Sequence, residues 1–168
     1  ESPTIAGLSR IVEQGRSSGV ELPIPPIVAA ERPEAVPLSF AQQRLWFLDQ
    51  LGAGSAYNVP IAVALSGKLD LRALASSLRA MEERHESLRT CFREGGGKPF
   101  QVVSREGRLE LSLVDLSHLS ASEREEGVGR LLFDEAHRPF DLTRAPLLRA
   151  TVIREEEDRH LFLLTMHH

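Results

Sequence analysis

From residue 39 onward, the hydrophobic positions switch repeatedly between helical and strand spacing. Helical spacing follows Ser39, Asp70 and Ser120, which predicts helices over 39–52, 70–86 and 120–137. Gln42 and Glu123 lie three residues after two of these starts, which is the spacing of a capping box. Strand spacing or β-rich composition marks 59–65, 88–93, 100–103, 109–113, 147–153 and 161–166. Helices and strands interleave without strict βαβ spacing, which predicts an α/β layered sandwich with a mixed sheet.

The first 36 residues follow a different pattern. A short helix is expected over 2–14, with Ser2 as its N-cap, Pro3 at its first position and Gly15 after its end. Residues 15–36 begin with glycines and serines and then become rich in proline. Repeated prolines prevent a regular helix or central strand, so an extended linker is expected there. The predicted organisation is therefore a helix over 1–14, a linker over 15–36 and a main domain over 37–168.

Composition and charge exclude several classes of protein. The chain has 168 residues, 42% hydrophobic residues and a net charge of -4, which is too apolar for disorder and too acidic for a nucleic-acid binder. No run approaches the roughly 18 apolar residues of a membrane span, and the first residues do not resemble a signal peptide. The single cysteine, Cys91, cannot form an internal disulfide, which favours the reducing conditions of the cytoplasm.

Few residues in the chain suggest a catalytic or ligand-binding motif. The glycines at 95–97 precede Lys98 and Pro99, which does not fit a phosphate-binding P-loop and favours a hairpin turn. No Gly-x-Ser-x-Gly motif is present, and Cys91 lies in an apolar strand pattern typical of a packed thiol. The histidines at 85, 118, 137 and 160 lack the spacing of metal ligands, so no metal site is expected.

The adjacent pair His167 and His168 differs from the other histidines. Neighbouring residues of a strand point to opposite faces, so one imidazole can be held inside while the other faces a cleft as a general base. From the residues alone, an incidental or tag-derived pair remains an open interpretation. Arg44 lies beside the apolar stripe of its predicted helix, where a half-buried guanidinium would need a carboxylate partner.

Three stretches of the chain resemble the ordered core motifs of condensation domains in nonribosomal peptide synthetases. Residues 37–48, PLSFAQQRLWFL, resemble the first motif, and residues 84–92, RHESLRTCF, resemble the second. Residues 166–168, MHH, resemble the opening of the third motif, His-His-x-x-x-Asp-Gly, and residues 54–60, 138–142 and 145–149 also fit the family. The resemblance implies a chloramphenicol-acetyltransferase-like fold, a two-layer sandwich, of which 37–168 would be the N-terminal half.

The same resemblance implies a reaction and a set of site residues. Condensation domains form an amide bond between a donor thioester and an acceptor aminoacyl thioester during the synthesis of peptide antibiotics and other secondary metabolites. Phosphopantetheine arms of upstream and downstream carrier proteins hold both substrates, and the domain itself binds no cofactor. His168 would be catalytic, with His167 as its structural partner, and Arg44 would pair with the aspartate of the third motif. Because that aspartate and the C-terminal half lie outside residues 1–168, we expect this fragment to be inactive alone.

The resemblance also covers the N-terminus and leaves two alternatives. Residues 2–8 resemble the last helix of a peptidyl carrier protein, so 15–36 would link carrier and condensation domains. An epimerisation domain shares the fold and the histidine pair, but its first motif usually lacks the pattern seen at 41–48. A non-catalytic module that docks carrier proteins would need no histidine. The first motif favours the subclass that joins two L-configured residues.

Overall fold

The described residues of the N-terminal unit form one helix. The computed structural model describes residues 4–17, 26, 28, 31–33 and 35–168, and it separates into two units, Glu1–Arg32 and Pro33–His168. In the first unit, helix α1 (Ile5–Ser17) begins after Thr4, whose Oγ1 accepts the N–H of Gly7 at 3.2 Å. The predicted cap residues, Ser2 and Pro3, lie outside the described residues.

Helix α1 also ends later than expected. The sequence predicts an end at Gly15, but the helix continues to Ser17, whose Oγ donates to the carbonyl oxygen of Glu13 at 2.7 Å. Glycine in a helix costs about 1 kcal/mol relative to alanine, which weakens the helix without ending it. The bounds 2–14 were therefore wrong at the C-terminal end, where the backbone hydrogen bonds of one more turn outweigh the glycine.

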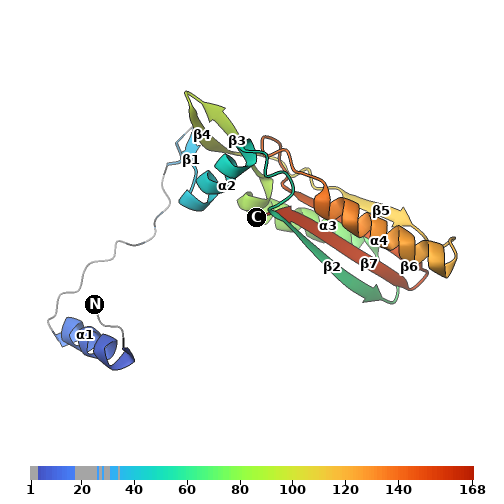
Figure 1. Ribbon diagram of the computed structural model, residues 1–168, viewed down its shortest axis with the longest axis horizontal. Helices are drawn as coiled ribbons and strands as arrows, with labels where there is room; N and C mark the ends of the chain where they lie inside the picture. Colours follow the sequence, from blue (N-terminus) through green and yellow to red (C-terminus); the bar gives the residue numbers. More distant parts are fainter. Residues whose placement is uncertain (1–3, 18–25, 27, 29–30, 34) are drawn as a thin grey trace. The chain divides into compact units, whose positions relative to one another are not determined.

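The second unit is built on two β-sheets (Figure 1). The smaller sheet has the antiparallel order β1 (Val36–Pro37), β4 (Lys98–Val103), β3 (Thr90–Gly95). The larger sheet has the order β2 (Asn58–Ser66), β7 (Arg159–His167), β6 (Leu148–Glu156), β5 (Leu111–Asp115). Its strands are antiparallel except for the parallel pair β5 and β6, so this sheet is mixed, as the sequence predicts.

The helices of this unit begin where their capping residues predict. Ser39 and Gln42 form a capping box at the start of α2 (Phe40–Gln50), and Ser120 with Glu123 forms one at α4 (Ala121–His137). The Asp70 side chain accepts two backbone N–H groups at the start of α3 (Leu71–Arg84). These contacts are local in sequence, which is why the sequence alone identifies them.

Two predicted strands begin two residues later than expected. The strand expected over 88–93 starts at Thr90, because Glu86–Arg89 forms the short 3-10 helix η1. Thr90 Oγ1 donates to the carbonyl oxygen of Glu86 at 2.6 Å, and Arg89 pairs with Glu86 at 3.6 Å. Both contacts stabilise the turn against the β-propensity of its residues. The expected strand over 109–113 also begins later, at Leu111.

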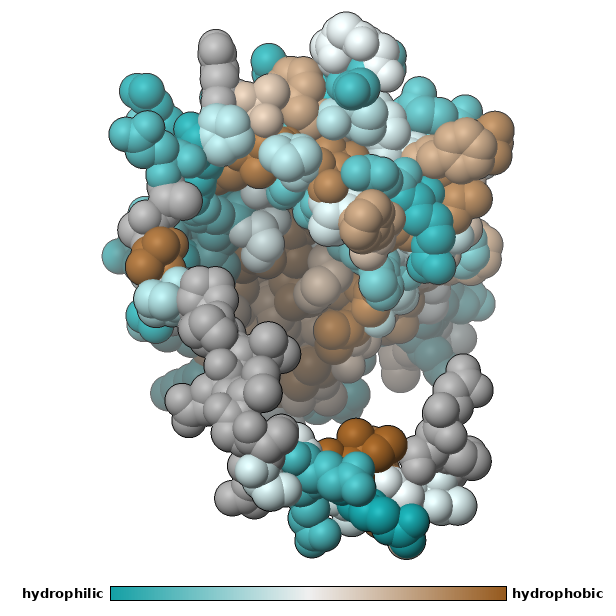
Figure 2. Space-filling model, turned by 90° about the vertical axis from the view of Figure 1, so that its left-hand side faces the viewer, coloured by the Kyte–Doolittle hydropathy of each residue, from teal (hydrophilic) through white to brown (hydrophobic). Residues whose placement is uncertain are grey.

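Among the described residues, one of two clusters of buried hydrophobic residues lies between the larger sheet and α3, and the second includes Trp46 of α2. Leu78 of α3 packs with Leu109 and with Leu148 and Ala150 of β6. Because side chains alternate along a strand, Arg149 points to the opposite face, where it pairs with Glu135 of α4. Helices α3 and α4 therefore cover opposite faces of the sheet, as Figure 1 shows. In the space-filling view, hydrophobic residues line a central hollow, and others lie on the outer surface among hydrophilic residues (Figure 2).

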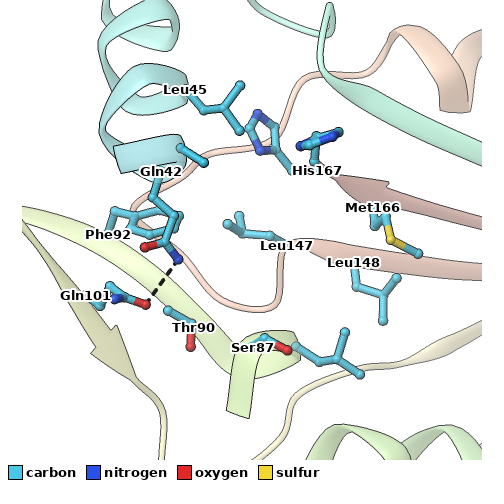
Figure 3. A pocket seen from close by; sticks show the side chains of 13 residues that line it. Gln42, Leu45, Ser87, Thr90, Phe92, Gln101, Leu147, Leu148, Met166 and His167 are labelled. Carbon is cyan, nitrogen blue, oxygen red and sulfur yellow. Dashed lines mark hydrogen bonds between the residues drawn. The ribbon is translucent and has the colours of Figure 1, made fainter. Parts of the chain in front are cut away.

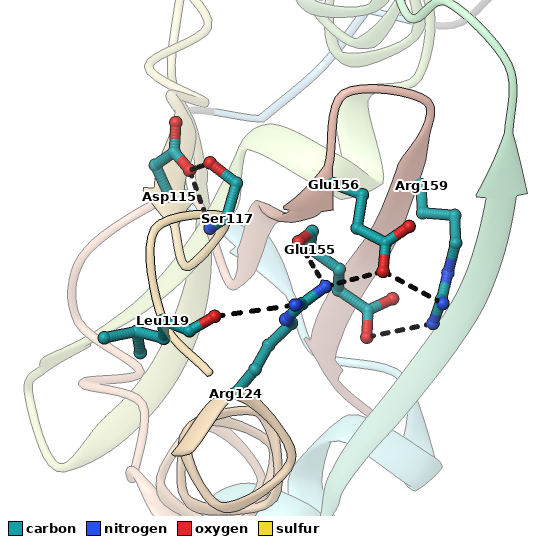
Figure 4. Close-up of polar contacts among 7 residues, drawn as sticks. All are labelled: Asp115, Ser117, Leu119, Arg124, Glu155, Glu156 and Arg159. Carbon is teal, nitrogen blue, oxygen red and sulfur yellow. Dashed lines mark hydrogen bonds and ion pairs between the residues drawn. The ribbon is translucent and has the colours of Figure 1, made fainter. Parts of the chain in front are cut away.

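A polar network attaches the first turns of α4 to the turn between β6 and β7 (Figure 4). Arg124 Nη1 donates to the Glu155 carbonyl oxygen at 2.8 Å and to Glu156 Oε1 at 2.7 Å. Glu156 also binds Arg159 at 3.3 Å, so one carboxylate joins two guanidinium groups. This network fixes the N-terminal end of α4 at the end of the sheet away from His167. No helix in the described segments is long and apolar enough to cross a membrane.

Candidate functional site

A cavity of about 350 Å³ lies where helix α2, the β3–β4 hairpin and the end of β7 meet (Figure 3). Most of its lining is apolar, and both histidines of the predicted pair contribute to it. The lining residues are Ala41, Gln42, Leu45, Ser87, Leu88, Thr90, Phe92, Gln101, Leu147, Leu148, Met166, His167 and His168. All three stretches that resemble family motifs therefore contribute to one cavity, although they lie far apart in the sequence.

His167 is the last residue of β7 and is held from several sides. Its backbone N–H donates to the carbonyl oxygen of Leu147 at 3.1 Å. Its ring lies 6.3 Å from the Phe140 ring in an edge-on arrangement and 6.4 Å from the Tyr57 ring. Burial lowers the pKa of His167 below its usual value, although the His168 backbone and the Asp49 carboxylate partly oppose this shift. The side chain is therefore neutral at pH 7.

His168 lies at the edge of the same cavity and is exposed to solvent. Its backbone N–H donates to the carbonyl oxygen of Tyr57 at 3.0 Å, and this hydrogen bond holds the backbone that carries the imidazole side chain. A histidine at the mouth of a mostly apolar cavity can exchange protons with solvent and with a group bound inside. The pair thus has one supported ring and one accessible ring. Both line the same cavity rather than opposite faces of the strand, because His168 lies just beyond the end of β7.

Arg44 is not joined to the histidines by a direct contact. It lies on α2 next to Leu45, which lines the cavity, but its own side chain is exposed. No hydrogen bond or ion pair connects this side chain to another residue in the described part of the chain. The structure therefore brings His167 and His168 to one cavity and leaves Arg44 on the adjacent helix surface.

Glutamine side chains fix one wall of the cavity. Gln42 Nε2 donates to Gln101 Oε1 at 3.2 Å, and Gln101 Nε2 donates to the carbonyl oxygen of Pro37 at 2.8 Å (Figure 3). Gln42 also accepts the Ser39 N–H at 2.8 Å as part of the capping box. The same residue thus begins helix α2 and connects it to the hairpin. The sequence identifies Gln42 only as a cap, because its partner lies far along the chain.

The sequence did not predict the group of residues that packs next to His167 and consists of Phe140, Arg149 and Glu135. The Arg149 guanidinium lies 3.7 Å from the centre of the Phe140 ring, which in turn contacts His167. Arg149 pairs with Glu135 and donates to the carbonyl oxygen of Arg138 at 2.8 Å. Burial lowers the pKa of Arg149, and the Glu135 carboxylate opposes that shift. The family-like stretches 138–142 and 145–149 contain several of these residues, but nothing in them reveals the contacts.

A metal ion needs several ligating side chains close together. Among the described residues, no group of three or more His, Cys, Asp or Glu side chains is placed to hold one. Cys91 is buried and free, as the apolar strand pattern predicts. The chemical groups of the cavity are therefore imidazole, amide and hydroxyl side chains in apolar surroundings.

Comparison with known proteins gives consistent matches. Residues 33–168 match the family model described as "Condensation domain". A linear gramicidin synthase protein from Brevibacillus parabrevis is 50% identical over 138 residues, which is 82% of this chain and 2% of that protein. Tyrocidine synthase 3 from the same organism is 43% identical over 169 residues, which is 100% of this chain and 2% of that protein. The chain thus spans only a small part of the curated relatives that it matches.

A solved structure supports the fold. The first condensation domain of the calcium-dependent antibiotic synthetase, in complex with a substrate analogue, superposes with a TM-score of 0.71 and 24% sequence identity. The match covers 80% of this chain and 33% of that chain. The predicted chloramphenicol-acetyltransferase-like class, α/β with a mixed sheet, is confirmed by this similarity.

Proposed function

This chain belongs to the condensation-domain family of nonribosomal peptide synthetases, and we propose that residues 37–168 are the N-terminal subdomain of an amide-forming domain. The donor is an acyl or peptidyl thioester and the acceptor is an aminoacyl thioester. The observation that carries the proposal is that His167 and His168 enter one cavity together with residues of the other two family-like stretches. That shared cavity provides a place where an amine and a thioester could meet.

The proposed chemistry requires one proton acceptor. The acceptor amine attacks the donor carbonyl carbon, a C–N bond forms, the C–S bond breaks and a thiolate leaves. His168 takes a proton from the attacking nitrogen and returns it to the departing sulfur, so the imidazole is regenerated. The apolar lining excludes water that would otherwise hydrolyse the thioester. Epimerisation, which moves a proton at the α-carbon, would use the same imidazole.

We assign supporting roles to His167 and Arg44. His167 is neutral and packed between two aromatic rings, so it supports the backbone from which His168 projects. Arg44 is exposed on the helix beside the cavity and would bind a carboxylate outside residues 1–168. The fragment alone would then be inactive, because the proposed partner of Arg44 and the C-terminal half-domain would both be needed.

Carrier proteins are the proposed partners, and their phosphopantetheine arms would carry both substrates. Helix α1 exposes Ile5, Leu8, Ile11 and Val12, with Ile5 87% exposed. An isolated helix of this length is marginal in water. Its unpartnered apolar side supports the proposal that residues 1–14 complete a carrier protein and that 15–36 are the linker. The free thiol of Cys91 favours placement in the cytoplasm.

The test uses the parent synthetase with carrier domains loaded with donor and acceptor. His168→Ala should reduce the rate of amide formation at least about a hundredfold, the usual contribution of a general base, measured by mass spectrometry of the carrier-bound product. His118→Ala, at an exposed position outside the cavity, is the matched control and should keep the parental rate. Unchanged condensation in His168→Ala would instead favour a carrier-docking module. Inverted configuration of an α-carbon, without a new amide, would favour epimerisation.

A further inference from the structure

A second cleft, of about 220 Å³, lies on the opposite side of the β3–β4 hairpin from the histidine cavity. Its lining includes Cys91, Arg93 and Val102, whereas Phe92 and Gln101 line the histidine cavity. Neighbouring residues of a strand point to opposite faces, so the two cavities use alternate residues of one hairpin. The second cleft is therefore separate from the proposed condensation site.

Three arginines from distant parts of the chain line this cleft. Arg93 comes from β3, Arg108 from the segment before β5, and Arg144 from the loop before β6. No acidic residue is among the lining residues. Arg93 and Arg108 form no salt bridge with another residue in the ranges that the structure describes. By contrast, Arg124 and Arg149 each bind a glutamate.

The nearest carboxylates already have donors. Asp141 attracts Arg144, but its carboxylate accepts the Thr143 N–H at 2.9 Å and the Thr143 hydroxyl at 2.6 Å. Buried Glu82 accepts the backbone N–H groups of Arg108 and Leu109, each at 3.0 Å. These carboxylates organise the loops on which two of the arginines lie. They leave the guanidinium groups as the dominant charge within the cleft.

We propose that this cleft binds a phosphate or pyrophosphate group. Guanidinium groups present paired N–H donors that match the oxygens of phosphate, and several of them together favour a multiply charged anion. The three arginines repel one another, and an anion bound among them relieves this repulsion. The local positive charge of the cleft contrasts with the net charge of -4 of the whole chain. The cleft is one compact cluster, whereas a nucleic-acid surface requires an extended basic stripe. The free anion and the same group on an organic ester share this chemistry.

The test is a titration of the 168-residue chain with inorganic pyrophosphate at constant ionic strength, followed by amide NMR. Shifts should concentrate at residues 91–93, 102–108 and 143–145. A parallel titration with a nucleoside diphosphate distinguishes the two sources of the ligand. Equal affinity indicates that the phosphate group alone is recognised, whereas tighter binding of the ester indicates an organic phosphate. Shifts confined to other parts of the chain, with either probe, would overturn the proposal.

Charge-matched variants separate the cleft from general attraction. Changing Arg93, Arg108 and Arg144 to Gln together should weaken pyrophosphate binding at least tenfold, and each single change about fivefold, since a surface charge pair contributes up to about that factor. The control changes Arg72, Arg79 and Arg84, all at exposed positions on α3, to Gln together, and it should change affinity less than twofold. Equal losses in the control and cleft variants would refute a specific site.

Three further measurements test whether weaker binding reflects unfolding, loss of the paired guanidinium donors, or binding of the anion in the histidine cavity. The unliganded arginine variants should unfold at the same urea concentration as the parent, because the three side chains are exposed. Arg93→Lys keeps the charge but loses the paired donors, so it should bind more weakly than the parent and more tightly than Arg93→Gln. His168→Ala should bind pyrophosphate as the parent does, since the proposal is independent of condensation. Weakened binding in His168→Ala would show that the anion occupies the histidine cavity instead.

Discussion

The ion pair behind His167 makes a prediction that can be worked out from the structure. Arg149 and Glu135 have side chains that are only 17% and 13% exposed, and Arg149 also lies over the Phe140 ring. Arg149→Met keeps a long unbranched side chain but removes the charge and its hydrogen bonds. Glu135 would then retain only Arg138, at 3.0 Å, whose side chain is 58% exposed. The change therefore leaves a mostly buried carboxylate with a single, solvent-screened partner.

The expected loss of stability follows from these contacts. Removing one partner of a fully buried pair costs roughly 3–5 kcal/mol, and the remaining exposure and the Arg138 contact reduce this to about 2–3 kcal/mol. The lost cation–π contact adds about 0.5–1 kcal/mol. We expect Arg149→Met to lower the free energy of unfolding by about 3 kcal/mol. Adding Glu135→Leu removes the stranded charge, so the double variant should recover roughly 1–2 kcal/mol of that loss.

Urea unfolding of the 168-residue chain, followed by circular dichroism, measures all of these values. Arg154→Met is the matched control, because Arg154 pairs with Asp115 at 3.1 Å on the surface, with exposed fractions of 36% and 41%. It should cost no more than about 1 kcal/mol. If Arg149→Met costs as little as the control, or if the double variant loses the sum of the single losses, the pair does not act as described.

Three other perturbations test the fold and the site. Gly107→Ala would bring a Cβ to 2.6 Å from the Glu82 side-chain carbon Cδ and should lower the free energy of unfolding in urea by about 2 kcal/mol or more. Gly129→Ala is the control: the space around Gly129 is open, so this change should be neutral or stabilising. Because burial lowers the pKa of His167, the unfolded chain binds a proton at this residue more readily than the folded chain does. The free energy of unfolding should therefore fall as pH decreases from about 6.5 towards the lower pKa of the folded chain. His167→Gln should flatten that part of the curve of stability against pH, and an equally steep curve would contradict the lowered pKa of His167. Ile153→Ala, at a fully buried position, should cost about 2–5 kcal/mol, and a loss below about 1 kcal/mol would show that the core closes around the gap.

Local features of the sequence were read correctly where their physical causes are local. Ser39 and Ser120 begin helices because each accepts an N–H three residues away. Cys91 is buried, as its apolar strand pattern indicates. Where weak local signals competed, the prediction was less accurate. Gly15 did not end α1, and the turn at Glu86–Arg89 replaced the expected start of a strand.

The sequence by itself determined the element types, the mixed α/β class and the histidine pair at the end of a strand. The tertiary structure decided which residues surround that pair. Tyr57 and Phe140 lie beside the His167 ring, and Arg149 lies over the Phe140 ring, although all three come from separate segments. It also placed three arginines in one cleft and put Gly107 against Glu82. Caps and hydrophobic periods depend on residues within one or two turns, so a single sequence displays them. Contacts between distant segments depend on strand order and on the faces that the helices cover, and those are fixed only when the whole unit folds.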